Sequence, residues 1–397
     1  MEKPKIRFKG YQEDWEQRKV TELLKNSSSA MKIGPFGSAL KKEYFVEEGI
    51  KVYAQENAFT GDFSMGDYYI TEDKYKELKS CELYPGDLVI SMMGTIGACA
   101  IFPKNAEKGI MNSHLLRLQF NNEVIPEYIM YLLRDSVLIR KQIDRLSVGS
   151  IMSGLSSSVV KKLVFPIPKL AEQKRIVEYL DSIDRLITLH QRKCEEMKTL
   201  KKYMLQKMFP QNGQLVPQIR FSGFTEDWEQ RKVSELCSIS TGKSNTQDKV
   251  EDGEYPFYVR SPIIERSTKY LYDEEAVITV GDGVGTGKVF HYVNGKYDLH
   301  QRCYRMYGFS DELNAHYFYH TFSKLFYKRV MAMTAKTSVD SVRLEMISDM
   351  KIPVPNVEEQ RKIGNLLDGI DHLITLHQQK CDELRNIKKF MLQNMFI

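Results

Sequence analysis

Polar and basic side chains gather in loop-like stretches of this 397-residue chain. Four stretches mix Lys or Arg with Ser, Thr, Asn or Gln: GPFGSALKK at 34–42, TGKSNTQDK at 241–249, VRSP at 259–262 and AKTSVDSVR at 335–343. Lysine and arginine hold phosphates, and Arg, Asn and Gln can also form paired hydrogen bonds with base edges. Each stretch alone is typical of a solvated loop, but together they indicate contact with nucleic acid.

Residue type and loop position select the candidate contacts. In the first half of the chain they are Ser38, Lys41, Lys42, Gln55, Asn57 and Ser91. In the second half they are Thr241, Lys243, Ser244, Arg260, Lys288 and Lys336. We expect the lysines mainly to hold phosphates, and Gln55, Asn57 and Arg260 to read base edges.

Other kinds of site find little support. The glycine-rich loop 281–287 lacks the G-x-G-x-x-G spacing and is followed by a strand-like run, so it does not predict a dinucleotide site. TGKS at 241–244 ends like a phosphate loop, but Cys237 stands where the first glycine belongs. The chain has no H-E-x-x-H, no adenine-methyltransferase tetrapeptide and no C-x-x-C pair. We therefore predict no catalytic, cofactor or metal site, and reduced cysteines.

Composition indicates a folded intracellular protein. The chain has 57 Lys+Arg and 52 Asp+Glu, a net charge of +5, and 42% apolar residues. This charge permits nucleic-acid binding without requiring it. No apolar run is long enough for a membrane span, and the opening MEKPKIRFKG does not read as a signal peptide. We expect a cytoplasmic protein.

Two segments of the sequence occur twice. PKIRFKGYQEDWEQRKVTEL at 4–23 returns at 217–236 with 15 of 20 positions identical. The block at 166–209 returns at 353–396 with 25 of 44 identical. The inserts between these blocks differ in length, and each alternates β-prone runs with glycine turns before a helical stretch. The order of repeat and insert predicts a pseudo-two-fold protein built from two divergent copies of one mixed α/β domain.

The longer repeated block predicts a coiled-coil helix. Its apolar residues follow a 4-3-4 spacing, which His190 and Lys201 interrupt in the first copy and His377 and Lys388 in the second. Two-fold symmetry would make the two helices antiparallel, with the histidines as a core pair that sets register. Asn356 and Glu359 suit a capping box at the start of the second helix.

These patterns divide the chain into five parts and predict an α+β fold. The first insert domain with its repeat block spans 1–165, and the first long helix 166–209. A linker at 210–218 leads to the second insert domain at 219–352 and the second helix at 353–397. The prolines near 166 and 353 end the preceding strands.

With these blocks in view, the whole chain resembles the specificity subunits of type I restriction–modification systems. The resemblance rests on the paired FKGYQEDWEQRKVTEL and FSGFTEDWEQRKVSEL openings, the PIPKLAEQKRIVEYLDSID and PVPNVEEQRKIGNLLDGID helix starts, and the insert cores VISMMGTIG and AVITVGDGVGTGKVF. It implies that the inserts are target recognition domains, each reading half of an asymmetric bipartite site in double-stranded DNA. It also implies that the long helices form an antiparallel coiled coil.

The same resemblance implies that the chain is not an enzyme by itself. Two modification subunits would supply S-adenosylmethionine-dependent adenine methylation, and restriction subunits would supply ATP- and Mg-dependent cleavage. The helices would hold these partners. The alternative that the residues leave open is a coiled-coil scaffold that presents two protein-binding domains without touching DNA.

Overall fold

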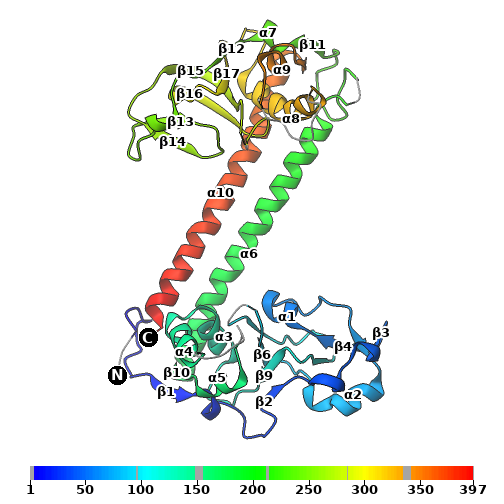
Figure 1. The fold of residues 1–397 in the computed structure, drawn as a ribbon, viewed down its shortest axis with the longest axis vertical. Coiled ribbons are helices and arrows are strands. Elements are labelled where there is room, and N and C mark those ends of the chain that lie inside the picture. The colour runs from blue at the N-terminus through cyan, green and yellow to red at the C-terminus, as the bar shows by residue number, and fades with distance from the viewer. Residues whose placement is uncertain are drawn as a thin grey trace. The chain divides into compact units, whose positions relative to one another are not determined.

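The structure, a computed structural model, describes residues 4–94, 97–147, 155–211, 214–283, 285–333 and 341–396 (Figure 1). The chain forms two compact units. The first comprises Met1–Leu189 with Lys380–Ile397, and the second comprises His190–Gln379. Each unit therefore contains the first half of one long helix and the last half of the other.

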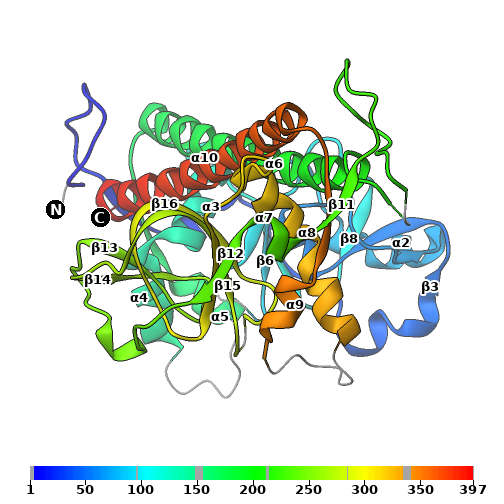
Figure 2. The ribbon, with the colours of Figure 1, turned by 90° about the horizontal axis from the view of Figure 1, so that it is seen from above.

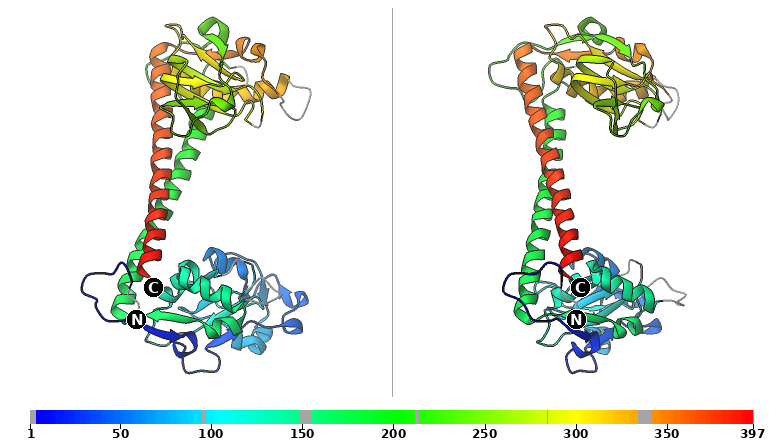
Figure 3. Two further views of the ribbon diagram at one scale, coloured as in Figure 1. Left: turned by 60° about the vertical axis from the view of Figure 1, so that its left-hand side comes forward. Right: turned by 90° about the vertical axis from the view of Figure 1, so that its left-hand side faces the viewer.

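The two long helices are α6 (Leu170–Lys207) and α10 (Val357–Met395). At 1.5 Å per residue a helix of this length spans roughly 57 Å. They lie side by side and run in opposite chain directions, as both views in Figure 3 show. The predicted antiparallel coiled coil is confirmed, although α6 begins four residues later than the repeated block at 166.

The residues that interrupt the apolar seam meet partners across it. In the second unit, Nδ1 of His190 lies 3.0 Å from Nδ1 of His377. Lys201 in that unit donates to the carboxylate of Asp371 at 2.6 and 2.7 Å. In the first unit, Lys388 donates to Asp184 at 2.7 and 2.9 Å. These polar pairs fix the register of two helices whose apolar seam alone would tolerate sliding.

In the first unit, the insert forms two four-stranded sheets. One has the order β2 (Met31–Ile33), β9 (Leu115–Leu118), β6 (Leu88–Ser91) and β7 (Cys99–Ile101). The other has the order β3 (Phe45–Val46), β5 (Tyr69–Ile70), β4 (Ile50–Tyr53) and β8 (Gly109–Met111). The helices are α1 (Gln55–Thr60), α2 (Glu72–Leu78), α3 (Pro126–Asp135), α4 (Val137–Leu146) and α5 (Ser157–Lys162).

In the second unit, the insert forms one six-stranded sheet. Its order is β12 (Ser238–Thr241), β17 (Cys303–Tyr307), β15 (Tyr272–Val280), β16 (Phe290–Leu299), β13 (Tyr255–Tyr258) and β14 (Ile264–Ser267). The helices are α7 (Val233–Leu236), α8 (Ala315–Met333) and α9 (Leu344–Ser348). Figure 2 shows the strongly curved sheet, and α8 packs against β15 and β16.

The strand order shows that the two inserts are copies of one domain. The order β2-β9-β6-β7 matches β12-β17-β15-β16. In both units a parallel pair follows, β4 with β8 and β13 with β16. The single helical stretch predicted in the first insert is divided at Ser136, whose hydroxyl caps α4 through the backbone N–H of Ile139. Its counterpart α8 continues without a break.

The shorter repeated block forms one strand of a small ladder in each unit. β1 (Glu16–Lys19) pairs with β10 (Val164–Ile167), and β11 (Glu229–Lys232) pairs with β18 (Lys351–Val354), both antiparallel. Each ladder therefore joins the start of a repeat to the strand that leads into a long helix.

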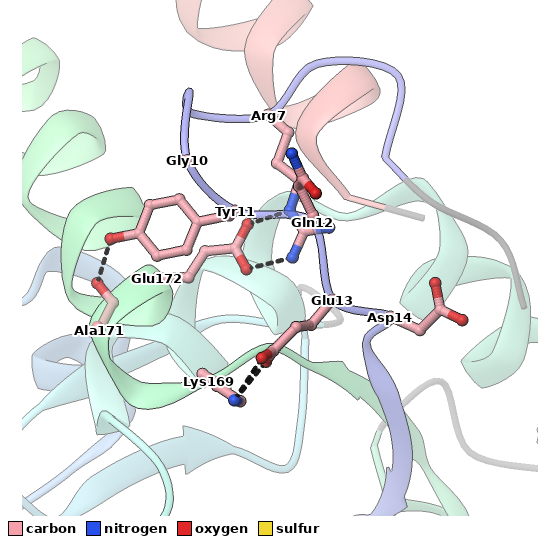
Figure 4. A pocket seen from close by; sticks show the side chains of 9 residues that line it. All are labelled: Arg7, Gly10, Tyr11, Gln12, Glu13, Asp14, Lys169, Ala171 and Glu172. Carbon is pink, nitrogen blue, oxygen red and sulfur yellow. Dashed lines mark hydrogen bonds and ion pairs between the residues drawn. The ribbon is translucent and has the colours of Figure 1, made fainter.

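The repeated residues also form a buried ion-pair clamp at the start of each long helix. Glu172 accepts hydrogen bonds from Nε and Nη2 of Arg7, both at 2.7 Å, and from the Trp15 indole at 3.2 Å. Figure 4 shows this clamp beside a pocket that Tyr11 and Lys169 also line. In the second unit, Arg220 binds Glu359 at 2.7 and 2.9 Å. The residues that are identical between the two repeats thus include the ones that hold each long helix to its unit.

The second clamp corrects the capping-box prediction. Asn356 does cap the helix, because its side-chain oxygen accepts from the backbone N–H of Glu358 at 2.9 Å. Glu359, however, is fully buried and binds Arg220 instead of the backbone at the cap. A long-range charge pair therefore replaces the local interaction that the spacing suggested.

The chain ends lie together in the first unit. The backbone N–H of Ile6 donates to the carbonyl of Asn394 at 2.9 Å. In the second unit, the N–H of Ile219 donates to the carbonyl of Lys207 at 2.9 Å. Ile6 and Asn394 in the first unit thus correspond to Ile219 and Lys207 in the second.

Candidate nucleic-acid interface

In the second unit, several loops meet around residues 300–302, which link β16 to β17. Backbone hydrogen bonds of 2.8–3.0 Å hold them there. His300 N–H donates to Tyr258 O, Gln301 N–H to Ser244 O, and Gly281 N–H to Arg302 O. Val342 N–H donates to Gly281 O at 2.7 Å. Residues of three of the four predicted polar stretches, 241–249, 259–262 and the described end of 335–343 at 341–343, therefore contribute to one surface.

Two exposed arginines share one carboxylate on this surface. Nη1 of Arg260 lies 3.3 Å from Oδ1 of Asp282, and Nη1 of Arg302 lies 2.8 Å from Oδ2. The arginine side chains are 44% and 62% exposed, whereas that of Asp282 is 17% exposed. Asp282 therefore holds both guanidinium groups while leaving N–H donors free for an incoming partner.

His300 lies under the loop that carries Arg302 and hydrogen-bonds to its backbone. It is buried, and its Nδ1 accepts from the backbone N–H of Arg302 at 3.1 Å. Burial, with the charges of Arg260 and Arg302, lowers the pKa of His300. The ring is therefore neutral near pH 7 and adds a hydrogen bond to the loop without adding charge.

The first unit repeats the backbone frame with different side chains. Asn112 N–H donates to Tyr53 O, Met92 N–H to His114 O and Gly34 N–H to Leu115 O, at 2.9–3.1 Å. The matching bonds in the second unit join His300 to Tyr258, Gly281 to Arg302 and Gly242 to Cys303. By this correspondence, the positions of Arg260, Asp282 and Arg302 are occupied in the first unit by Gln55, Met93 and His114.

Glycine allows the close packing of this frame. A side chain at Gly34 would place its Cβ 1.8 Å from the carbonyl oxygen of Asn112. At Gly242 the corresponding atom would lie 2.1 Å from the carbonyl oxygen of Leu299. The glycines of the GPFG and TGKS stretches therefore let these loops pack directly against the backbone that connects two strands. This packing role accounts for the glycines without a phosphate-binding loop.

Several candidate residues lie at the surface as predicted. Ser38, Lys41 and Lys42 are exposed in the loop after β2, where Lys41 pairs with Glu43 at 3.5 Å. Gln55 is half-buried at the start of α1, and Thr241 is half-buried at the end of β12.

The remaining exposed candidates lie in the second unit. Lys243 is exposed in the loop after β12. Lys288 is exposed as well, with its ammonium 4.8 Å from the centre of the Tyr327 ring on α8. Lys336 lies outside the described residues.

Three candidates need correction because their side chains are buried. The Asn57 amide donates to the carbonyls of Asp62 and Met65 and accepts from the N–H of Ala54. The Ser91 hydroxyl donates to Met93 O at 2.8 Å, and the Ser244 hydroxyl donates to Asp298 at 2.7 Å. In this structure these groups hold loops in shape, because short polar side chains readily bond to nearby backbone or side-chain groups.

Arg302, Asp282 and His114 are not among the contact residues predicted from the sequence. Arg302 lies in HQRCYRMY at 300–307, one of the β-prone runs of the second insert. The available signal was the junction itself, because Arg302 lies three residues before Arg305 and directly before the strand that begins at Cys303. Arg305, by contrast, is buried against Glu274 and between the Tyr272 and Tyr307 rings, so it belongs to the core.

The described residues contain no group of three or more His, Cys, Asp or Glu arranged to hold a metal ion. All six cysteines are buried, and none forms a disulfide bond among the described residues. Among the described helices, none is long and apolar enough to cross a membrane.

Comparison with known proteins identifies a family model for the type I restriction modification DNA specificity domain. It matches residues 12–199 and 225–386, one stretch for each repeat. Among curated relatives, the MjaVIII specificity subunit of Methanocaldococcus jannaschii is 24% identical over 310 residues, covering 71% of this chain and 72% of the relative. The EcoDI specificity subunit of Escherichia coli is 23% identical over 163 residues, covering 41% and 35%.

A solved structure has the same fold. The S subunit of a type I restriction–modification system from M. genitalium superposes with a TM-score of 0.71 at 16% sequence identity. The match covers 100% of this chain and 99% of that chain.

Proposed function

Since the chain belongs to the family of type I restriction–modification DNA specificity subunits, we propose that its two domains each read one half of an asymmetric bipartite site in double-stranded DNA. The chain itself is not the catalyst. In this proposal, two modification subunits bring S-adenosylmethionine-dependent adenine methylation and restriction subunits bring ATP- and Mg-dependent cleavage, in the cytoplasm of a bacterial or archaeal cell.

One observation carries the proposal of two unlike half-sites. The two units share one backbone frame but place Gln55, Met93 and His114 where the other has Arg260, Asp282 and Arg302. Glutamine pairs best with adenine, and arginine pairs best with guanine, in the major groove. We therefore infer that the first unit prefers A·T and the second unit prefers G·C at the positions these residues reach.

The direct test is adenine-methylation mapping in cells that carry matched modification and restriction subunits, with and without this chain. The expected result is a new bipartite motif with one methylated adenine per half-site, on opposite strands. If no motif forms while a control specificity chain produces one with the same partners, the scaffold alternative gains the advantage.

Phosphate-binding lysines should be separable from base-reading residues. Lys42 is exposed and no carboxylate among the described residues pairs with it. Lys42→Ala is expected to weaken binding to every duplex and to reduce the slope of log K against log salt by about one. Binding measured from low to high salt on cognate and random duplexes tests this. Lys76→Ala, which removes an exposed lysine paired with Asp73 on α2, should leave the slope unchanged. A loss confined to the cognate duplex would contradict the phosphate role.

The long helices carry exposed apolar residues outside the seam. In the first unit these are Leu186 and Leu189 on α6 with Ile387 and Phe390 on α10, each 42–55% exposed. In the second unit, Tyr203 on α6 and Leu373 and Leu376 on α10 are 40–48% exposed, beside half-buried Leu200. Each helix thus has a second apolar stripe, interrupted by an ion pair, Lys193–Glu196 on α6 and Lys380–Glu383 on α10.

The stripe positions favour a protein partner. Leu186 and Leu189 each directly precede a seam residue, Ile187 and His190, so they lie beside the seam in the heptad. Leu373 and Leu376 hold the same positions on α10. In an antiparallel pair such flanking positions of both helices lie on one face. Exposed apolar side chains grouped in this way are typical of protein interfaces. We propose that each unit binds one modification subunit here.

Substitutions in each patch should remove one partner copy at a time. Phe390→Glu, in the first unit, and Tyr203→Glu, in the second, are each expected to reduce two bound modification subunits to one. The double variant should bind none, because a buried unpaired carboxylate opposes the interface. Native mass spectrometry of co-purified complexes counts the copies. Arg192→Ala, on the helix face away from the seam, is the control. Retention of both copies by the double variant would contradict the assignment.

A further inference from the structure

The second unit contains a lysine-rich hollow between α6 and α8 that the proposed function does not use. Its volume is about 540 Å³. Lys198, Lys201, Lys202 and Lys324 line it, with Leu205 and Ile374 as apolar walls and two glutamines completing the rim. No carboxylate lines it. Lys198 pairs with Glu195 and Lys201 with Asp371, whereas no carboxylate among the described residues pairs with Lys202 or Lys324.

Lys324 is the unusual member of this set. It lies within α8, and its ammonium nitrogen is shielded from solvent without a hydrogen-bond partner among the described residues. The nearest compensation is the Phe209 ring, whose centre lies 4.5 Å away. Burial lowers the pKa of Lys324 to about 8. A cation–π contact offsets only part of the cost of burying an unpaired ammonium, so the site favours an anion.

The first unit shows which residue corresponds to Lys324. Tyr128 on α3 donates to Pro166 O, and Tyr317 on α8 donates to Pro353 O. Three residues later in each helix, Tyr131 binds Asp181 and His320 binds Asp368, and these two aspartates are equivalent in the repeat. Four residues further along each helix, Asp135 of the first unit is therefore equivalent to Lys324 of the second.

The same position therefore carries opposite charges in the two copies. In the first unit, Asp135 lies 3.7 Å from the ammonium of Lys388, which also binds Asp184. In the second unit, the equivalent lysine is Lys201, which binds the equivalent aspartate, Asp371. Lys324 takes the place of the second carboxylate. In the first unit the seam lysine thus has a second carboxylate, from Asp135, whereas the second unit has the ammonium of Lys324 at that position.

We propose that the hollow around Lys324 binds a carboxylate from an acidic side chain of another protein. In the first unit the Asp135 carboxylate lies beside the seam lysine Lys388. In the second unit Lys324 occupies the position of Asp135, so an incoming carboxylate would bind in the hollow next to Lys324 and restore a pairing of carboxylate with cation. The apolar walls suit the methylene stem of a glutamate. Within the part of the chain that the structure describes, the site occurs in the second unit and not in the first, so a partner that uses it distinguishes the two otherwise similar units. That the partner is a subunit of the restriction–modification complex rests on the proposed function; the carboxylate site does not.

The test titrates the full-length chain, labelled with ¹³C at lysine Cε, by NMR in the presence of glutarate. The Lys324 signal is identified by its absence in Lys324→Met. Glutarate is expected to raise the Lys324 titration midpoint by about one pH unit relative to sodium chloride at equal ionic strength. One unit corresponds to about tenfold tighter binding to the protonated amine. Lys202→Gln should reduce this shift, whereas Lys193→Gln, an exposed lysine paired with Glu196, should not.

A second variant separates loss of the site from loss of the fold. Lys324→Asp recreates the first unit's arrangement and is expected to fold and to abolish glutarate binding, monitored as glutarate line broadening. A midpoint that glutarate moves no further than chloride does would overturn the proposal. So would glutarate binding retained by Lys324→Asp, or a shift with inorganic phosphate and none with glutarate. None of these measurements uses DNA or a partner subunit, so their failure is distinct from failure of the proposed function.

Discussion

Replacing both Arg260 and Arg302 with alanine is expected to abolish discrimination in one half-site while leaving the other half-site intact. Each bidentate contact between an arginine and guanine contributes about 1–3 kcal/mol of discrimination against the wrong base. Two such contacts together contribute about 2–6 kcal/mol, so the double variant should lose at least roughly 30-fold in preference for G·C at the positions that the second unit reads.

The geometry explains why this effect should be large. Asp282 holds both guanidinium groups before any partner arrives, with Nη1 contacts of 3.3 and 2.8 Å. An ordered arginine loses less side-chain freedom on binding than a mobile one. Asp282→Asn should separate the two effects, because removing the carboxylate leaves both positive charges but not their alignment. We expect that variant to bind all duplexes more tightly and to discriminate less.

Competitive binding to a duplex library, in the assembled complex and at fixed salt, measures this discrimination. Arg361→Ala is a matched control, since Arg361 is an exposed arginine of the same unit that pairs with Glu358. It should leave the preference unchanged. A double variant that loses affinity equally for all sequences would show that the arginines hold phosphates instead of reading bases.

Removing the buried carboxylate of Glu172 is expected to have the largest effect on stability. Glu172 is 2% exposed and accepts hydrogen bonds from Arg7 and Trp15. Glu172→Ala leaves a guanidinium and an indole N–H without their partner in the protein interior. Breaking a buried pair in this way costs about 3–5 kcal/mol. For a unit of this size, the melting temperature should fall by roughly 6–20 °C.

The second repeat provides an internal comparison for this prediction. Glu359 binds Arg220 in the same way, but the Trp228 indole N–H has no hydrogen-bond partner among the described residues. Glu359→Ala should therefore cost less than Glu172→Ala by about one hydrogen bond, roughly 1 kcal/mol. Calorimetry of the full chain, with Glu178→Ala as an exposed control on α6, measures both. Equal melting temperatures for Glu172→Ala and the parent chain would contradict the clamp's structural role.

Much of the architecture could be predicted from the chain because its signals are periodic or repeated. The 4-3-4 apolar spacing predicts both long helices and places His190 and His377 in their seam, where they meet at 3.0 Å. The repeated openings predict two equivalent units, and the matching strand orders confirm that the inserts are copies. Periodicity depends on the backbone geometry of each element, so it is readable without knowing what the element packs against.

The candidate site was only partly predictable for the opposite reason. Ser91 and Ser244 have the composition of contact residues, but Met93 O and Asp298 take up their hydroxyls. Arg302 and Arg305 lie three residues apart, yet one is exposed beside Asp282 and the other is buried against Glu274. Exposure depends on neighbours that are remote in sequence, which residue type does not reveal.

The sequence by itself therefore determined the repeat, the two helices, the two insert domains and the class of residue that its loops offer. Only the tertiary structure decided that Glu359 serves a clamp instead of a cap, that Gln55 and Arg260 occupy equivalent positions, and that Lys324 stands in the place of Asp135. Each of these depends on charges or hydrogen bonds between residues far apart in the chain. Such pairings are set by how the elements pack and not by local spacing.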